Sequence, residues 1–154
     1  RYHNVYGPRM GLDHVIPELM DKLFHHTDPL PVYGLEQTRA FCYVTDAVEA
    51  TQALMACRLD SCELVHVGVD EETSITKLLE KILKVTGFQP TIQSLPAPIG
   101  AVSRRCPDIG KLRRLTEFEP GVPLDTGLSL TWEWYGRNRE PNVDTRDLSS
   151  SVHE

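Results

Sequence analysis

Short runs of β-branched and aromatic residues alternate with stretches of helical periodicity along this chain of 154 residues. The clearest helix is predicted from Thr73 or Ser74 to Gly87, because apolar residues recur every three or four positions between a capping hydroxyl and a glycine stop. Strands that alternate with helices are typical of α/β proteins. The sequence therefore predicts an α/β fold with short strands.

The remaining elements are predicted in the same way. The chain opens with an extended segment, 1–6, which ends at the Gly7-Pro8 turn. Asp13 is expected to cap a helix whose apolar stripe runs from Val15 to Phe24. Further strands are predicted at 30–33, 39–44, 64–67 and 90–95, and the strand at 64–67 is expected to be covered on both faces. Further helices are predicted after Thr45, from Asp108 and after Asp125. The helix after Thr45 is expected to bury Ala47, Ala50, Thr51, Leu54 and Met55.

Charge and hydropathy exclude two classes of partner. The 16 Lys and Arg against 22 Asp and Glu give a net charge of −6, and no run of basic residues is present to neutralise the phosphates of a polynucleotide. Nor does any stretch reach the roughly 20 apolar residues of a membrane-spanning helix. We therefore expect a soluble protein that binds neither nucleic acid nor membranes.

The cysteines and histidines do not form a metal-binding pattern. The four cysteines include no CxxC pair, so reduced thiols in a cytoplasmic protein are the expectation. His25 and His26 are adjacent and point different ways on a helix, which favours a solvated helix end over a metal site. No metal ligand is predicted.

Several common catalytic and nucleotide-binding motifs are absent from the sequence. There is no GxGxxG, no GxxxxGK[ST], no HExxH and no GxSxG, which removes the usual signatures of dinucleotide folds, phosphate loops, zinc hydrolases and serine hydrolases. No residue of this chain is assigned a catalytic role.

Arginines stand where predicted turns meet predicted strands. Arg9 follows Gly7-Pro8, Arg39 opens a strand, and Arg104 and Arg105 lie before Pro107. The planar guanidinium makes bidentate contacts, which suits it to bind a diphosphate. A surface salt bridge is the alternative for each of them.

These arginines belong to an ordered series of motifs over about residues 1–136. The motifs are Arg1-x-x-Asn4-x-Tyr6-Gly7-Pro8-Arg9-Met10, Val15-Ile16-Pro17, Val32-Tyr33-Gly34-x-x-Gln37-Thr38-Arg39-Ala40-Phe41-x-Tyr43-Val44-x-Asp46, Arg105-x-Pro107-Asp108-Ile109, Phe118-x-Pro120 and Gly127-Leu128. The series resembles the extended short-chain dehydrogenase/reductase family that acts on nucleotide sugars, and most of all its UDP-glucuronate decarboxylases and the related nucleotide-sugar epimerases and dehydratases.

The resemblance implies the C-terminal, substrate-binding half of such an enzyme. Family members bind NAD on an N-terminal Rossmann sheet and transfer protons with a Tyr-xxx-Lys pair, and no tyrosine here has a lysine four residues later. We expect residues 1–138 to be the nucleotide-sugar-binding half and residues 139–154 to be a flexible tail. The chain alone is predicted to be inactive. Its parent would be an epimerase, dehydratase or decarboxylase acting through a transient keto-sugar; the alternative is a non-catalytic nucleotide-sugar binder or regulatory module.

Residue roles carried over from the family are expectations of the same kind. Asn4 would donate to the phosphates, Tyr33 would lie in the nucleotide pocket, and Arg39 and Arg105 would clamp the diphosphate. Val5 and His14 would lie near the nicotinamide. Two departures are visible. The family's Asn-x-Gly is His66-x-Gly68 here, and the loop between Met10 and Val15 is shorter than in the decarboxylases and lacks the cationic residue that they place before the next helix, unless His14 substitutes for it.

The resemblance also implies which molecules the protein meets. NAD would be bound mainly by the N-terminal Rossmann half, which would itself be a partner of this chain. The other expected partners are the nucleotide-sugar substrate and, for the full enzyme, a second copy in a homodimer.

Overall fold

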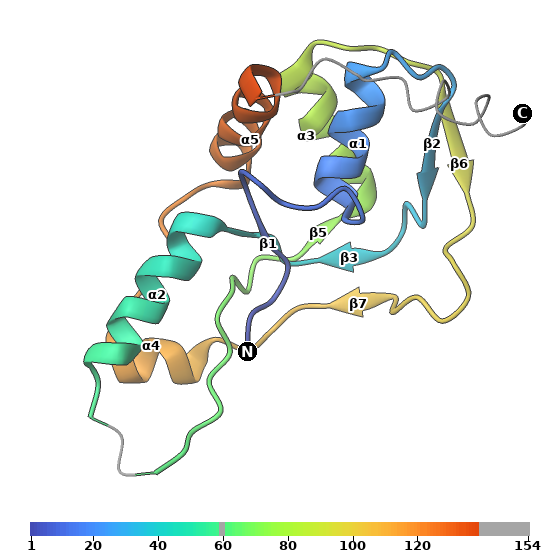
Figure 1. Cartoon of the computed structure of the whole chain (residues 1–154). Coiled ribbons are helices and arrows are strands. Elements are labelled where there is room, and N and C mark those ends of the chain that lie inside the picture. The colour runs from blue at the N-terminus through green and yellow to red at the C-terminus, as the bar shows by residue number, and fades with distance from the viewer. Residues whose placement is uncertain (59–60, 139–154) are drawn as a thin grey trace, which may run out of the picture.

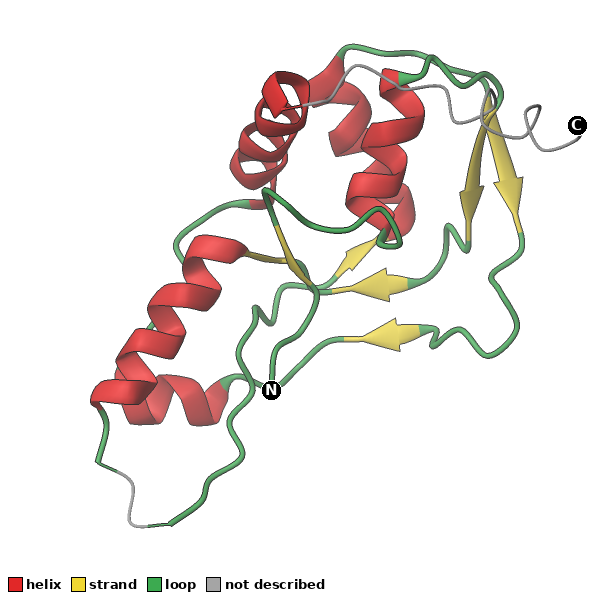
Figure 2. Ribbon diagram, in the orientation of Figure 1, coloured by secondary structure: helices red, strands yellow, loops and turns green. Residues whose placement is uncertain are grey.

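The structure is a computed structural model that describes residues 1–58 and 61–138. The predicted tail at 139–154 lies outside the described residues. The predicted α/β class is confirmed, with helices in two groups and short strands between and beside them (Figures 1 and 2). One group holds α1 (Val15–Phe24), α3 (Ile75–Thr86) and α5 (Leu124–Asn138), and the other holds α2 (Val44–Ala56) and α4 (Gly110–Thr116).

The strands form three small sheets rather than one large sheet. Parallel pairing dominates, as expected where helices connect successive strands. Two sheets are parallel pairs, β1 (Val5–Tyr6) with β4 (Cys42–Tyr43) and β2 (Leu30–Tyr33) with β6 (Ile92–Leu95); in the third, β3 (Thr38–Arg39) lies antiparallel to β5 (Thr73–Ser74) and parallel to β7 (Arg104–Arg105).

Local sequence explains α3 fully. The Ser74 side chain accepts a hydrogen bond from the Lys77 N–H at 3.1 Å, and Gly87 ends the helix with a left-handed φ of 75°. The apolar stripe between them is buried, and Leu78 and Ile82 are fully enclosed. The predicted cap, stripe and stop are confirmed.

The start of α1 differs from the prediction. Its N-cap residue is His14, and no side chain caps the helix. The predicted capping role of Asp13 was therefore wrong, because the chain places this residue one position too early. The apolar stripe is buried as predicted, with Ile16, Leu19 and Leu23 in the core.

The predicted strand at 39–44 is interrupted. Residues 38–39 form β3, residues 42–43 form β4, and Val44 already belongs to α2. Helix α2 buries Ala47 and Ala50 as predicted, but the side chain of Met55 is 81% exposed, which corrects its assignment to the buried face. The end of α2 contacts α4 through Cys57 instead, whose Sγ donates to the Leu115 carbonyl at 3.1 Å.

The segment at 64–67 is only partly as predicted. It forms a single parallel bridge, between Tyr2 and Val67, rather than a strand. Val65 and Val67 are buried in a second core with α2 and α4, whereas Leu64 is exposed. No helix within residues 1–58 and 61–138 is long and apolar enough to cross a membrane.

Contacts of two core residues, Asp46 and Tyr6, attach α5 and the segment before it to the rest of the fold. The buried Asp46 carboxylate accepts the backbone N–H groups of Gly121 and Val122 at 3.2 and 3.1 Å, which fixes the segment that leads into α5. Tyr6 donates its hydroxyl to the Leu124 carbonyl at 3.3 Å, and Gly127 provides the space for this ring against α5. Helix α5 is thereby held beside β1.

Candidate functional site

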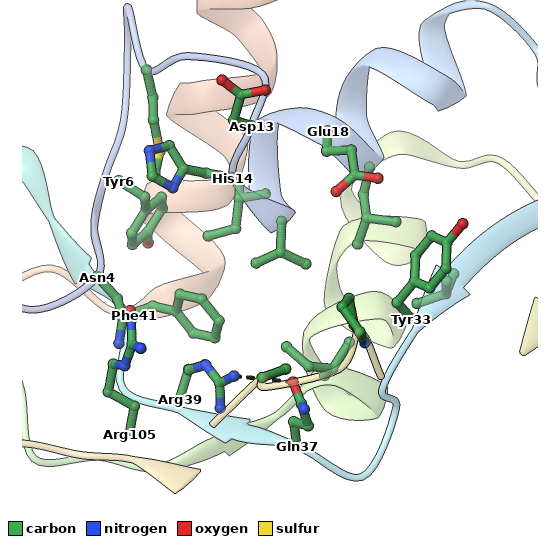
Figure 3. A pocket seen from close by; sticks show the side chains of 18 of the residues that line it. Asn4, Tyr6, Asp13, His14, Glu18, Tyr33, Gln37, Arg39, Phe41 and Arg105 are labelled. Atoms are coloured by element: carbon green, nitrogen blue, oxygen red, sulfur yellow. Dashed lines mark hydrogen bonds between the residues drawn. The ribbon is translucent and has the colours of Figure 1, made fainter. Parts of the chain in front are cut away.

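A cavity of about 360 Å³ opens between α1, β2 and the β3–β7 sheet. Five of the six residues predicted to bind substrate or cofactor line it: Asn4, His14, Tyr33, Arg39 and Arg105. Figure 3 shows their side chains around one space, together with Tyr6, Asp13, Glu18, Gln37 and Phe41.

Val5 lies elsewhere. It belongs to β1 and lines a separate groove between that strand and α2. Asn4, the preceding residue, has a positive φ of 40°, which turns the chain locally between the cavity and this groove. The predicted contact of Val5 with a cofactor stays a prediction.

The two arginines are neighbours because of strand register. Residues 38–39 of β3 pair with residues 104–105 of β7, so that Arg39 lies directly opposite Arg105. Adjacent strands are about 4.8 Å apart, which brings two positive charges to one edge of the cavity. Burial lowers the pKa of Arg39, and the charge of Arg105 lowers it further.

Arg39 is held in place by neutral acceptors. Its Nη1 donates to the Thr38 carbonyl at 2.7 Å and the Ser103 carbonyl at 3.2 Å, and its Nη2 donates to Gln37 Oε1 at 3.0 Å. These contacts orient the guanidinium without neutralising it. An anion in the cavity would supply the missing negative charge.

The side chain of Arg105 has no hydrogen bond or ion pair with another described residue, whereas the side chain of its neighbour Arg104 has both. Arg104 Nη2 lies 2.8 Å from Glu72 Oε2 at the surface. The predicted alternative of a structural salt bridge therefore describes Arg104 and not Arg105. Asp46 and Asp108, the nearby carboxylates in sequence, accept backbone N–H groups instead.

Asn4 and Tyr33 occupy two sides of the cavity. Asn4 Nδ2 donates to the Ala40 carbonyl at 3.0 Å, which fixes the amide beside β3. Tyr33 is 48% exposed, and the ammonium of Lys22 lies 5.8 Å from its ring centroid. The ring thus presents a flat, accessible surface at the mouth of the cavity.

A histidine pair was not predicted. His3 Nε2 and His66 Nδ1 are 2.6 Å apart, within hydrogen-bond distance. Burial is the main cause that lowers the pKa of His3, and His66, Arg1, the N-terminal amino group and Arg105 lower it further. The sequence showed only that His66 replaces the family's asparagine, and no local pattern pairs it with a residue 63 positions earlier.

Two buried groups, Tyr6 and Cys42, are not suited to proton transfer or nucleophilic attack at neutral pH. Burial raises the pKa of the Tyr6 phenol, which therefore stays protonated at neutral pH. Burial also raises the pKa of the Cys42 thiol to about 12, and this thiol does not line the cavity. Among the described residues no cluster of three or more His, Cys, Asp or Glu side chains could hold a metal ion.

The fold is that of an α/β protein. Its cavity contains a pair of arginines suited to an anionic ligand. Comparison with known proteins agrees with this class. The model of the NAD dependent epimerase/dehydratase family matches residues 1–68.

Curated relatives extend the match over most of the chain. The UDP-N-acetyl-alpha-D-glucosaminuronate decarboxylase of Bacillus cytotoxicus is 36% identical over 145 residues, covering 88% of this chain and 44% of the relative. The UDP-glucuronic acid decarboxylase 1 of Danio rerio is 34% identical over 149 residues, covering 95% of this chain and 35% of the relative. The chain thus spans less than half the length of these relatives.

Solved structures match over a similar share. The UDP-glucuronic acid 4-epimerase of Bacillus cereus, in complex with UDP-glucuronic acid and NAD, has a TM-score of 0.82 and 27% identity, covering 89% of this chain and 44% of that one. The resemblance identified from the sequence is confirmed: the relatives are NAD-dependent nucleotide-sugar epimerases, dehydratases and decarboxylases.

Proposed function

We propose that residues 1–138 are the nucleotide-sugar-binding half of an NAD-dependent enzyme that epimerises, dehydrates or decarboxylates the sugar. One observation carries this proposal: Arg39 and Arg105 face one cavity side by side without a carboxylate partner among the described residues. Such a pair suits a diphosphate, because each guanidinium can donate two parallel hydrogen bonds to phosphate oxygens.

The other cavity residues complete the proposed substrate site. Asn4 would present its remaining amide groups to the phosphates, since one N–H is used by the Ala40 carbonyl. Tyr33 would contact the nucleotide at the mouth of the cavity. His14 would lie toward the cofactor, at the N-cap of α1.

The described residues fit one diphosphate rather than two. Among the described residues that line the cavity, the arginines lie at a single edge, and the sequence has no glycine-rich turn to hold a second pyrophosphate. NAD would therefore be held mainly by the preceding Rossmann half, and it would supply the hydride chemistry there. This chain would bind and orient the sugar nucleotide.

An apolar groove offers a surface for that Rossmann half. The groove has a volume of about 500 Å³, with side chains of β1 and α2 on its walls, and Tyr2 and Val48 are 60% and 50% exposed. The backbone groups of Tyr2 point away from its bridge to Val67, because successive residues of a strand face opposite edges. We propose that a strand and helices of the Rossmann half cover this edge and groove.

The groove leads to a prediction for this chain alone. Val48→Glu is expected to lower the fluorescence of a bound hydrophobic dye at least about twofold, because a carboxylate disrupts the exposed apolar patch. Leu130→Glu is the matched control, since Leu130 is 44% exposed on α5 and does not line the groove. An equal decrease in both variants, or no dye binding at all, would argue against a docking surface here.

The proposed function is tested by titration calorimetry of this chain with UDP, dTDP and GDP, each of which carries the diphosphate. At least one is expected to bind, whereas NAD should be lost on gel filtration and no nucleotide sugar should turn over. Failure of all three nucleotides would overturn the proposal. Turnover by the rigorously purified chain would refute its assignment as one half of an enzyme.

The same proposal includes two features of the complete enzyme, a homodimer and a cytoplasmic location. Thiols kept reduced in that compartment agree with the four free cysteines at positions 42, 57, 62 and 106.

A non-catalytic nucleotide-sugar binder is the second candidate. The two are separated by the intact mass of the natural protein, because an enzyme needs roughly 150–180 further residues for its Rossmann half.

A further inference from the structure

A neutral side chain, that of Gln37, holds one of the two arginines at the edge of the cavity. Arg39 Nη2 donates to Gln37 Oε1 at 3.0 Å, and Figure 3 shows this hydrogen bond as a dashed line. Both residues line the cavity. Gln37 therefore influences both the orientation of Arg39 and the charge that surrounds it.

The backbone of Gln37 is anchored at two points. Its N–H donates to the Gly34 carbonyl at 2.9 Å, and its carbonyl accepts the N–H of Ile75, at the start of α3, at 2.9 Å. The side chain lies against Gly34, where a Cβ would be only 2.9 Å from Gln37 Cδ, so glycine leaves the space that this side chain occupies. The turn after β2 and the start of α3 thus fix the position from which the Gln37 amide reaches Arg39.

The chemistry of arginine decides which amide atom faces it. A guanidinium only donates hydrogen bonds, so the atom that faces Nη2 must be the amide oxygen of Gln37. The other two acceptors of Arg39 in the described chain are the backbone carbonyls of Thr38 and Ser103. Of the three acceptors, only Gln37 has a charge that depends on the type of side chain.

The same contacts determine which donors of Arg39 are left for a ligand. A guanidinium has five N–H groups, two on each Nη atom and one on Nε. With one N–H for each acceptor, the carbonyls of Thr38 and Ser103 use both groups of Nη1, and Gln37 uses one group of Nη2. One N–H on Nε and one on Nη2 remain, and these can donate to an anion.

We propose that Gln37 is a positioning residue for the anion site, because its amide oxygen fixes the Arg39 guanidinium and its neutrality leaves the positive charge available. This role rests on the proposed function, in which Arg39 binds the diphosphate. A glutamate at this position could accept the same hydrogen bond, but it would pair with Arg39 and repel the phosphates. An amide at position 37 therefore permits anion binding, whereas a carboxylate opposes it.

Gln37→Glu tests the requirement for a neutral acceptor. Titration calorimetry with UDP is expected to show affinity lowered at least about tenfold, because a carboxylate beside Arg39 competes with the phosphates for its charge. The loss should shrink at high salt, and the melting temperature should not fall, since the variant gains an ion pair. UDP affinity equal to that of the unmodified chain would overturn the proposal.

Gln89→Glu is the matched control for the added charge. Gln89 is exposed beyond the end of α3 and does not line the cavity. The control should therefore change the affinity for UDP less than about twofold, because its carboxylate is screened by solvent and does not contact Arg39. An equal loss in both variants would show that net charge, rather than the contact with Arg39, weakens binding, and would overturn the proposal.

Gln37→Met tests the orienting hydrogen bond. Methionine is unbranched and keeps a side chain against Gly34, but its thioether is only a weak acceptor. UDP affinity is expected to fall about three- to tenfold, the range for one hydrogen bond. In an Arg39→Ala background the same substitution should have no further effect, because Gln37 acts through Arg39. A loss that persists without Arg39 would overturn the positioning role and show that Gln37 contacts the ligand itself.

NMR of the ligand-free chain tests this role independently of the proposed function. The hydrogen bond from Nη2 should slow rotation of the Arg39 guanidinium, so Gln37→Met should speed up this rotation at least about twofold, the lower limit for the loss of one hydrogen bond. Unchanged rotation would overturn the positioning role even where UDP binds. Failure of UDP, dTDP and GDP to bind the unmodified chain would refute the proposed function instead, and the rotation measurement would still decide whether Gln37 orients Arg39.

Discussion

Replacing Arg39 or Arg105 by alanine is expected to weaken the binding of a nucleoside diphosphate by roughly 10- to 150-fold. A charge-assisted hydrogen bond to a partly desolvated anion contributes about 1.5–3 kcal/mol, and about 1.4 kcal/mol corresponds to a tenfold change in affinity. Lysine should restore only part of the loss, because it keeps the charge but not the planar fork. Titration calorimetry with UDP, or with pyrophosphate as a base-free probe, measures the effect.

Arg104→Ala is the matched control. Arg104 is adjacent in sequence, but it is paired with Glu72 at the surface and does not line the cavity. Its loss should change the affinity for UDP less than about twofold, because its side chain does not line the cavity. If Arg39→Ala or Arg105→Ala lowered the melting temperature and left affinity unchanged, the residue would be a structural one and the diphosphate clamp would be wrong.

Elements that depend on neighbouring residues could be predicted from the sequence. Helix α3 is the clearest case, because its cap at Ser74, its stripe and its stop at Gly87 are within 14 consecutive positions. The predicted N-cap of α1 was wrong by one residue. An aspartate before a helix is a common cap residue in sequence, but the sequence does not show whether its carboxylate reaches the backbone N–H groups. That error concealed Asp13 as a cavity residue.

Features that depend on register and long-range contact could not be predicted. The break between β3 and β4 within one predicted strand arises because the two strands belong to separate sheets, which a single sequence does not specify. The pairing of Arg39 with Arg105 and of His3 with His66 each joins positions more than 60 residues apart. The family resemblance indicated both arginines, but only the fold shows that they lack a carboxylate partner in the described residues.

Gly127→Ala is expected to destabilise the protein by roughly 1–3 kcal/mol or more, through overpacking of a closed contact. A Cβ at this position would overlap Tyr6 Oη and would lie 2.8 Å from Tyr6 Cζ and 2.9 Å from Tyr43 Cδ2. Tyr6 is buried and its hydroxyl is held by the Leu124 carbonyl, so the ring cannot move without loss of packing or of that hydrogen bond. Thermal unfolding should show a melting temperature lowered by roughly 2–12 °C for a chain of this size.

The same helix supplies the control for this prediction. A Cβ at Gly136 would meet only Phe24, at 3.7 Å, so Gly136→Ala should raise stability by up to about 1 kcal/mol, because alanine loses less conformational entropy in a helix. Adding Tyr6→Phe to Gly127→Ala should recover part of the loss, since it removes the overlapping hydroxyl but leaves the ring. A melting temperature for Gly127→Ala equal to or above that of the unmodified chain would show that α5 does not pack on Tyr6 as described. Because Tyr6 also lines the cavity, the destabilised variant should bind UDP more weakly, whereas Gly136→Ala should bind it unchanged.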